Sequence, residues 1–288
     1  MTAFTLEFGR YRLDLGPKAC IMGILNATPD SFSDGGRFNT VDTAVKQGLK
    51  LVEDGAHILD IGGESSRPFA APVSEQEELD RVIPVIQALV KQISVPISID
   101  TVKSGVAKKA LDAGASFIND ITAFEKDPDM ADLAAERQVP VILMHMKGTP
   151  ETMQVNPDYD DLMTEIIAYL VSRADYAVRK GIKKENIILD PGIGFGKTVE
   201  HNLVLLNHLE KIIALGFPIL VGPSRKSFIQ KILSGKEKTP VGPDHVRTEY
   251  GTLAAVAASL MKGAHIVRVH DVEKLKPFTC ILDSIRNA

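Results

Sequence analysis

The sequence has little cysteine and no excess of positive charge. Only two cysteines, Cys20 and Cys280, occur among 288 residues, too few for a disulfide scaffold and too isolated for a zinc site. We therefore expect two reduced thiols. The formal net charge is −4 at pH 7, which provides no broad basic face of the kind that binds nucleic acid. Any phosphate chemistry must use a local positive site.

Long apolar runs are also lacking. Residues 1–16 alternate polar and apolar side chains, unlike a signal peptide, and no later segment approaches the length that crosses a bilayer. We expect a cytoplasmic protein with no membrane partner. With 44% hydrophobic and 24% charged residues, the composition is that of an ordinary globular protein. The length suits one large core, so we expect a single catalytic domain over residues 1–288.

Short apolar runs alternate with helical patterns from Ala19 onward. Eight runs predict strands: CIMGIL, HILDI, PISID, SFIND, VILMHM, NIILD, PILVG and HIVRV. Between them lie segments such as 41–55 and 77–92, in which apolar residues recur every three to four positions. Eight alternating units favour an α/β fold, the closed (β/α)8 TIM barrel. A doubly wound open sheet is the alternative, although no GxGxxG motif follows the first strand.

The N-terminal segment has a different, period-two pattern. Apolar residues alternate through 4–8 and again through 11–15, and Gly9-Arg10 separates the two runs. This spacing predicts a β-hairpin with a two-residue turn. Such a hairpin could cover one end of the barrel.

Polar residues gather where the predicted strands end. In a (β/α)8 barrel the loops after the strands meet on one face, where the chemistry takes place. A single Asp, Asn or Thr at a strand end could equally cap the next helix. The whole set is better explained by a site, and it comprises Asn26, Asp60, Asp100, Asn119, Asp120, His145, Asp190, Lys226, Arg268 and His270.

Two polar, turn-rich segments follow the first two barrel strands and are typical of mobile loops. The segment 26–36, NATPDSFSDGG, is too polar for the core, and long loops at barrel tops are usually lids. The segment 62–68, GGESSRP, combines flexible backbone, two hydroxyl groups and the guanidinium of Arg67. That combination suits an anion that is held and released, and a solvated surface arginine is the alternative.

Both segments resemble the mobile loops of dihydropteroate synthases, which run NxTPDSFSDGG and GGES(T/S)RP. The resemblance departs at Ala27, Ser66 and Ile193, and because Ser66 keeps a hydroxyl, that change bears only on the fine positioning of the leaving group. Each motif is weak alone, but the ordered set is specific. It continues across nearly the whole chain through SIDT at 98–101, IND at 118–120, MHM at 144–146, DPGIGFGK at 190–197, GPSRKS at 222–227 and RVHDV at 268–272.

The resemblance implies an enzyme that condenses 6-hydroxymethyl-7,8-dihydropterin diphosphate with 4-aminobenzoate, giving 7,8-dihydropteroate and diphosphate. A pterin presents a fork of N–H donors that a buried carboxylate can accept in pairs, and Asp190 is the candidate. An aspartate in a turn before Pro-Gly is the alternative. The resemblance implies a pterin pocket lined by four residues, with Met144 and Phe195 beside it: Asp100, Asn119, Asp190 and Lys226. Gly222 is also expected to bind substrate.

The other half of the substrate is an anion. Arg268 and His270 alternate with Val269, so both point the same way, and the resemblance implies that Arg268 covers the pterin while His270 helps bind diphosphate. A structural histidine is the alternative for His270. The resemblance also implies that Asn26 helps to hold a Mg²⁺ ion on the diphosphate. One protein ligand is enough when phosphates and water supply the others. The other histidines show no metal-binding spacing.

For the second substrate, Ser227 is expected to begin a helix whose free N–H groups attract the carboxylate of aminobenzoate. Pro68 and Phe195 could form apolar walls around its ring. Arg225 could support either the loops or the docked acid. The expected catalytic residues are Asp34, Ser66, Arg67, Asp100 and Lys226.

Loss of diphosphate is the difficult step, because the aniline nitrogen of 4-aminobenzoate is already neutral and needs no strong base. We therefore favour dissociative substitution over direct displacement, as the resemblance also implies. A corrinoid methyltransferase of the related pterin-binding barrels is a rival, but it would not need the anion site. A non-catalytic pterin-binding paralogue is a second rival, and it predicts loss of loop residues that are present here. The resemblance also implies a homodimer.

Overall fold

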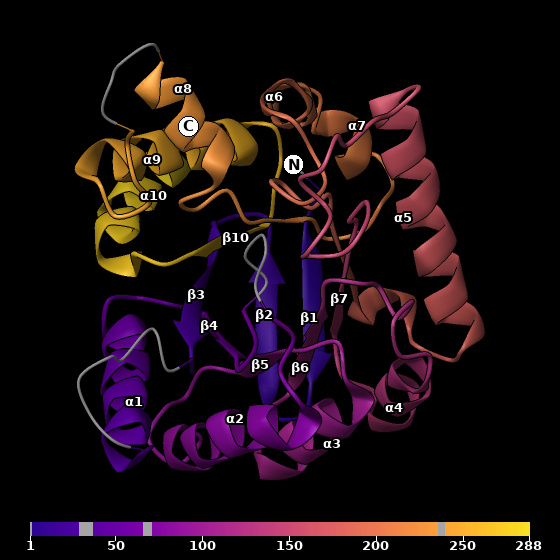
Figure 1. Ribbon diagram of the computed structural model, residues 1–288, viewed down its shortest axis with the longest axis vertical. Helices are drawn as coiled ribbons and strands as arrows, with labels where there is room; N and C mark the ends of the chain where they lie inside the picture. Colours follow the sequence, from indigo (N-terminus) through magenta and orange to yellow (C-terminus); the bar gives the residue numbers. More distant parts are fainter. Residues whose placement is uncertain (1, 29–36, 66–70, 236–239) are drawn as a thin grey trace.

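The structure, a computed structural model, describes residues 2–28, 37–65, 71–235 and 240–288 (Figure 1). Its parallel strands pair in the order β8-β7-β6-β5-β4-β3-β10-β9. A bridge from Leu189 in β8 to Ile219, just before β9, joins the two ends of this sheet. The predicted (β/α)8 barrel is confirmed, and the open doubly wound alternative is wrong. The strands are β3 (Cys20–Asn26), β4 (Ile58–Gly62), β5 (Ile97–Asp100), β6 (Phe117–Asp120), β7 (Val141–Met144), β8 (Ile187–Asp190), β9 (Leu220–Val221) and β10 (Ile266–Val269).

Helices ring the barrel in Figure 1. Outward-facing strand residues such as Leu59 and Ile99 pack with helix residues such as Ile86 in one large apolar core. The helices are α1 (Arg37–Glu53), α2 (Glu75–Leu89), α3 (Ser104–Ala113), α4 (Asp129–Arg137), α5 (Leu162–Arg179), the short 3-10 helix η2 (Lys184–Asn186), α6 (Val199–Asn207), α7 (Glu210–Ile213), α8 (Ser227–Ser234), α9 (Val246–Met261) and α10 (Val272–Arg286).

The predicted hairpin is present as β1 (Phe4–Phe8) and β2 (Tyr11–Leu15), which pair antiparallel. The turn contains Gly9, whose φ of 53° lies in the left-handed region that glycine adopts without strain. Leu6, Phe8 and Leu15 pack against the interior residues at the amino ends of the barrel strands. The ring of Phe8 meets that of Phe117 edge to face, with centroids 4.9 Å apart. The hairpin therefore closes the end of the barrel opposite the expected site.

On β4, β6, β8 and β10 the interior side chains change from apolar to polar toward the carboxyl end of the strand. Because side chains alternate along a strand, the residue two positions after an interior residue also faces the interior. Ile58, Phe117, Ile188 and Ile266 belong to the apolar layer beneath the site. Two positions later stand Asp60, Asn119, Asp190 and Arg268, which we call the polar layer.

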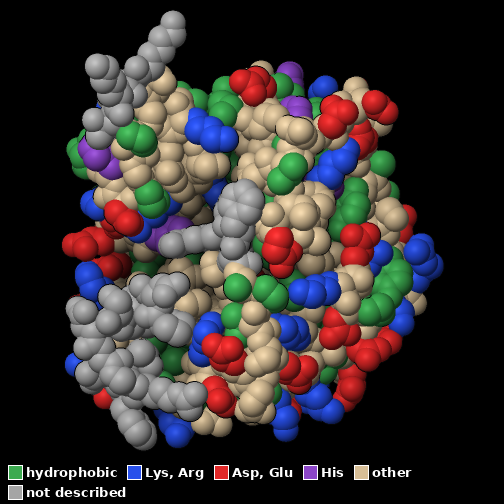
Figure 2. Space-filling model, in the orientation of Figure 1, with side chains coloured by type: hydrophobic (Ala, Val, Ile, Leu, Met, Phe, Trp, Pro, Cys, Tyr) green, Lys and Arg blue, Asp and Glu red, His purple; other side chains and the backbone are tan. Residues whose placement is uncertain are grey.

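Other features of the described chain bear on the sequence-based expectations. Acidic and basic side chains are interspersed over the face shown in Figure 2. None of the helices described is both long and apolar enough to cross a membrane. Cys20 is buried and Cys280 is exposed, and both are free thiols as predicted.

Candidate active site

The expected site residues come together at the carboxyl ends of the strands. Asn26, Asp100, Met144 and Asp190 are the last residues of β3, β5, β7 and β8. Parallel strands in a barrel place these ends around one opening. Asn119 in β6, Gly222 after β9, and Arg268 in β10 with His270 behind it complete the same rim. The expected residues Asp34, Ser66, Arg67 and Pro68 lie outside the described residues.

Arg268 bridges two carboxylates across the barrel mouth. Its Nε donates to Oδ2 of Asp60 at 2.6 Å, and its Nη2 donates to Oδ2 of Asp100 at 2.7 Å. The same oxygen of Asp60 accepts from Nδ2 of Asn119 at 3.0 Å. These side chains come from strands far apart in the sequence, so their meeting is a property of the closed barrel.

Burial controls the charge states of this cluster. It raises the pKa of Asp100 to about 7, against the attraction of Arg268, and the negative charge of Asp60 adds to the rise. Burial works against the charge of Arg268 as well, yet Asp60 and Asp100 together raise its pKa above the usual range. The guanidinium is therefore a fixed positive charge in the mouth of the barrel.

Asp190 and Lys226 form the opposite side of the site. Oδ1 of Asp190 accepts from the backbone N–H of Gly192 at 2.7 Å, which orients the carboxylate. Burial raises the pKa of Asp190 to about 6, although this hydrogen bond and Lys226 oppose the shift. Burial lowers the pKa of Lys226 to about 7, with a further contribution from Arg268. Both groups therefore titrate near neutral pH, which is typical of functional sites.

The glycine-rich loop between β8 and α6 holds an aromatic ring beneath this lysine. Nζ of Lys226 lies 3.7 Å from the centre of the Phe195 ring. Gly192 has a φ of 70°, and a β-carbon there would overlap the carbonyl oxygen of His145. A β-carbon at Gly194 would lie 2.7 Å from Cδ of Lys226. The loop therefore packs so closely that only glycine fits at these positions.

Three successive carbonyl groups of this loop each accept a hydrogen bond from a side chain, two of them from outside the loop and one from Lys197 within it. The carbonyl of Gly194 accepts from Gln154 at 2.8 Å, and that of Gly196 accepts from the hydroxyl of Tyr159 at 2.8 Å. Nζ of Lys197 donates to the carbonyl of Phe195 at 2.8 Å. These bonds make the loop a rigid support for the Phe195 ring.

Lys197 is a second buried lysine beside the site. Its Nζ lies 3.0 Å from Nδ1 of His145. Burial lowers the pKa of Lys197 to about 7 and that of His145 to about 3, so the histidine is neutral and accepts the bond. His145 therefore has a structural contact with Lys197.

The segment after β9 brings the amino end of α8 to the rim, and the end of β10 brings His270 there. Nδ1 of His270 lies 3.0 Å from Oγ of Ser224. As predicted, Ser227 begins α8, and the preceding Lys226 makes no side-chain capping bond. The amino end of α8 can therefore offer N–H groups to an anion.

The side chain of Arg225 points toward α9 and away from the rim of the barrel. Its Nε donates to Glu249 at 2.6 Å and its Nη1 to Asp244 at 2.7 Å. These bonds favour the first of the two roles considered for Arg225, support of the loop.

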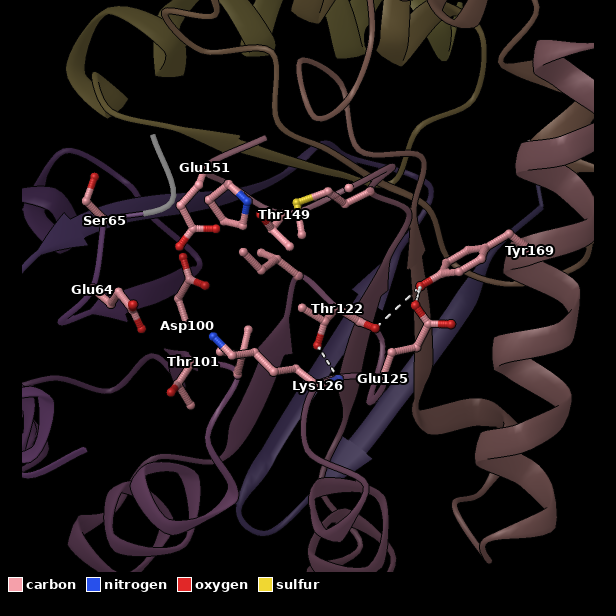
Figure 3. Close-up of a pocket in the computed structure, with 15 residues that line it drawn as sticks. Glu64, Ser65, Asp100, Thr101, Thr122, Glu125, Lys126, Thr149, Glu151 and Tyr169 are labelled. Carbon is pink, nitrogen blue, oxygen red and sulfur yellow. Dashed lines mark hydrogen bonds between the residues drawn. The ribbon is translucent and has the colours of Figure 1, made fainter. Parts of the chain in front are cut away.

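A cavity of about 400 Å³ opens beside Asp100 (Figure 3). Loops after β4, β5, β6 and β7 form its walls, with Glu64, Thr101 and Met146 among the lining residues. Tyr169 closes the far wall and donates to Glu125 at 3.1 Å. Asp100 thus stands between this cavity and Arg268, and it is the only one of the expected site residues in the described chain that lines the cavity.

A metal site built only from protein side chains is absent from the described ranges, where no three His, Cys, Asp or Glu residues converge. Asn26 lies half-buried at the end of β3 and offers one amide oxygen. This arrangement fits a Mg²⁺ ion that takes most of its ligands from phosphate and water.

Asp60 is a member of the cluster for which no role was predicted from the sequence. It was recognised only as a polar residue near a strand end. The signal that could have identified it is its position two residues after Ile58, which places it inside the barrel and level with Asn119 and Arg268.

Comparisons with known proteins agree with this geometry. The pterin-binding enzyme family matches residues 22–270. The dihydropteroate synthase of Synechocystis sp. is 48% identical over 280 residues, covering 97% of this chain and 94% of the relative. The crystal structure of Yersinia pestis dihydropteroate synthase with a sulfonamide drug is 44% identical, with a TM-score of 0.91 and coverage of 99% and 100% of the two chains. Xanthomonas albilineans dihydropteroate synthase with 4-aminobenzoic acid is 42% identical, with a TM-score of 0.90 and full coverage of both chains.

Proposed function

Because this chain belongs to the dihydropteroate synthase family of pterin-binding enzymes, we propose specific roles for the residues at its barrel mouth. The enzyme is a transferase that condenses 6-hydroxymethyl-7,8-dihydropterin diphosphate with 4-aminobenzoate, forming 7,8-dihydropteroate and diphosphate. One observation carries the assignment of roles: the barrel interior presents two titrating carboxylates, an amide, a lysine and an arginine in one ring above an apolar floor. We propose that residues 1–288 act as one catalytic domain.

The pterin is held by the polar side chains of this ring. Asp190 accepts from the 2-amino group and the neighbouring ring N–H, and Asn119 both donates and accepts beside it. Lys226 donates to the ring carbonyl oxygen, and Asp100 accepts from the remaining ring N–H. Met144 and Phe195 are buried and pack together, which supports their place beside the ring system, with Gly222 leaving room at the rim.

The diphosphate is held on the side of the site that faces Asp190 and Lys226. Arg67, Arg268 and His270 are its expected partners. Arg268 contacts Asp60 through Nε and Asp100 through Nη2. The arginine must therefore give up its contact with Asp100 before its guanidinium can stack on the pterin ring. Asp34 and Ser66, in the two loops, are proposed to position the leaving group.

Mg²⁺ is the proposed metal, and Asn26 is the residue that would hold it. The bound ion would supply positive charge to the diphosphate oxygens. The single amide ligand from the protein is consistent with a metal that arrives with its phosphate.

4-Aminobenzoate docks with its carboxylate at the amino end of α8, beside Ser227. Phe195 and Pro68 provide apolar walls for the ring. The absence of a side-chain cap at Lys226 supports this placement, because the first N–H groups of the helix are left for an anion. A sulfonamide, which mimics aminobenzoate in shape, should compete for the same place.

The reaction proceeds by loss of diphosphate before attack. Cleavage of the C–O bond leaves positive charge on the pterin methylene and negative charge on the leaving group. Asp100, ionised beside the pterin, stabilises the first charge, and Arg67, Arg268 and His270 stabilise the second. The neutral aniline nitrogen then attacks the methylene and afterwards loses its proton to solvent.

The experiment that tests these roles is an assay of diphosphate release with and without 4-aminobenzoate. We expect turnover only with both substrates, and a loss of about a hundredfold in kcat/KM for Arg268→Ala, a residue proposed to meet developing charge. Arg137→Ala, which removes a partly exposed arginine at the end of α4, is the matched control. Equal rates for the two variants would remove Arg268 from the anion site. A corrinoid methyltransferase would release no diphosphate, and a non-catalytic paralogue would bind pterin without turnover.

A homodimer is the proposed assembly, and the cytoplasm is the proposed location. Helices α6, α8 and α9 contact one another and carry exposed apolar side chains, including Leu203, Ile232 and Tyr250. Such a surface supports self-association, because contiguous exposed apolar area marks interfaces. Sedimentation at micromolar concentration tests it, and a monomer would contradict it.

A further inference from the structure

Asp60 lies inside the barrel between two of the proposed substrate-binding residues. It follows Ile58 by two positions on β4, so it faces the barrel interior, and its side chain is fully buried. Its Oδ2 atom accepts from Asn119 at 3.0 Å and from Arg268 at 2.6 Å. Asn119 reaches it from β6 and Arg268 from β10, two strands away on either side in the sheet order. One oxygen atom therefore connects opposite sides of the pocket.

We propose that Asp60 is a positioning residue that orients the amide of Asn119 and serves as the pivot about which Arg268 turns when pterin binds. This inference rests on the proposed function of the site.

The amide of Asn119 has two possible orientations, and Asp60 selects one. An ionised carboxylate only accepts hydrogen bonds, so the amide must turn its NH2 group toward Asp60. The amide oxygen then faces away from Asp60 and is free to accept from a pterin N–H group. The opposite orientation would set two oxygens against each other in a buried place, which is unfavourable.

Arg268 is held by its two ends, and only one of them must move. The Nη2 contact with Asp100 competes with the pterin N–H that Asp100 is proposed to accept. The Nε contact with Asp60 involves no proposed substrate group. If the Nε contact is kept while the Nη2 end moves away, the guanidinium stays close to the pterin ring. The buried arginine then avoids the desolvation penalty of losing both of its acidic partners.

Stability alone does not account for this carboxylate. Its Oδ1 atom is buried and has no hydrogen-bond partner among the described residues, and the same holds for Oγ of Ser98, which pairs in register with Asp60 on the next strand. A buried, half-satisfied carboxylate is a poor stabilising element. A role in binding explains why an acid stands there.

The test compares Asp60→Asn and Asp60→Leu with the control Ser98→Ala. Asparagine keeps an oxygen for both donors but removes the charge, whereas leucine removes the acceptor and frees the Asn119 amide. Ser98 pairs in register with Asp60, and its hydroxyl forms no hydrogen bond with Asn119 or Arg268, so its loss should leave binding unchanged. Thermal melting of each variant, with circular dichroism, shows that it is folded before binding is measured.

Binding of 6-hydroxymethyl-7,8-dihydropterin by calorimetry should weaken about tenfold in Asp60→Asn and further in Asp60→Leu, while Ser98→Ala matches the wild type. In an Arg268→Ala background the Asp60→Asn effect should shrink, because part of it acts through the arginine. Equal affinity of Asp60→Leu and Ser98→Ala would overturn the proposal. Failure of the wild-type enzyme to bind pterin would instead contradict the proposed function.

A pH profile separates positioning from a merely structural effect. The charged groups that act on Asp100 are Arg268, Asp60, Glu78 and Asp120. Removing the negative charge of Asp60 should move the acid limb of kcat/KM to lower pH, because Asp100 then ionises more readily. Asp60→Asn with an acid limb at the wild-type position would count against the electrostatic part of the role.

Discussion

Replacing Asp190 by asparagine changes the charge of the proposed pterin acceptor while keeping its shape. In the wild type, Oδ1 is held by the N–H of Gly192 at 2.7 Å. An asparagine would keep its carbonyl oxygen at that bond and turn its NH2 group toward the pterin. Donors would then face donors. Hydrogen bonds to charged groups contribute about 1.5–3 kcal/mol, so pterin binding should weaken by roughly tenfold to a hundredfold.

The pH dependence makes this prediction sharper. Burial raises the pKa of Asp190 to about 6, so the carboxylate is ionised at pH 7.5 and protonated at pH 5. A protonated carboxyl resembles an amide in that it also carries a donor. The difference in affinity between wild type and Asp190→Asn should therefore be large at pH 7.5 and small at pH 5.

Calorimetry with the dihydropterin at both pH values provides the measurement. Asp14→Asn, an exposed carboxyl on the hairpin at the other end of the barrel, is the control and should bind as the wild type does. Unchanged affinity in a folded Asp190→Asn variant at pH 7.5 would remove Asp190 from the pocket. A difference that persisted undiminished at pH 5 would show that the carboxylate charge is not its cause.

Three further expectations concern the same site. The kcat/KM of the free enzyme should have a narrow maximum near pH 7, because Asp100 and Asp190 must be ionised while Lys226, whose pKa burial lowers to about 7, must keep its proton; a flat profile from pH 5 to 9 would contradict this. Gly192→Ala should lower the free energy of unfolding by more than the roughly 1–2 kcal/mol of left-handed backbone strain. The control Gly216→Ala, where φ is 76° and no atom lies near the β-carbon, should show the strain alone. Equal losses in chemical denaturation would refute the close packing of the loop. Aminobenzoate should bind poorly to the free enzyme and well once pterin and diphosphate are present, and equal affinity by calorimetry in both cases would indicate a preformed acid site.

Much of the fold was predictable because its signals are local. Each strand is a short apolar run followed by polar residues, and each intervening helix has its own periodicity. The hairpin was predictable from period-two alternation around Gly9-Arg10, and its φ of 53° at Gly9 agrees with that turn. The start of α8 at Ser227 was likewise predictable from the motif that precedes it.

The contacts within the site were not predictable in the same way. Arg268 and Asp60 are 208 residues apart in the chain, and no periodicity shows that their side chains meet. The pairing of Arg268 with two acids depends on distances across the closed barrel. Lys197 was noted only as the last residue of the motif at 190–197. Its bond to His145 depends on how closely the loop after β8 packs against the end of β7.

The central claim is that the C–O bond to diphosphate breaks before the aniline attacks. It is tested most directly with substrate carrying ¹⁸O at the oxygen that bridges the pterin methylene and the diphosphate, incubated with enzyme and Mg²⁺ but without aminobenzoate. We predict that the label scrambles into non-bridging positions, and that Arg67→Ala suppresses scrambling more than it weakens substrate binding, because the arginine meets charge that develops in the transition state. Recovery of unscrambled substrate from an enzyme that turns over fully when aminobenzoate is added would contradict the claim and favour direct displacement.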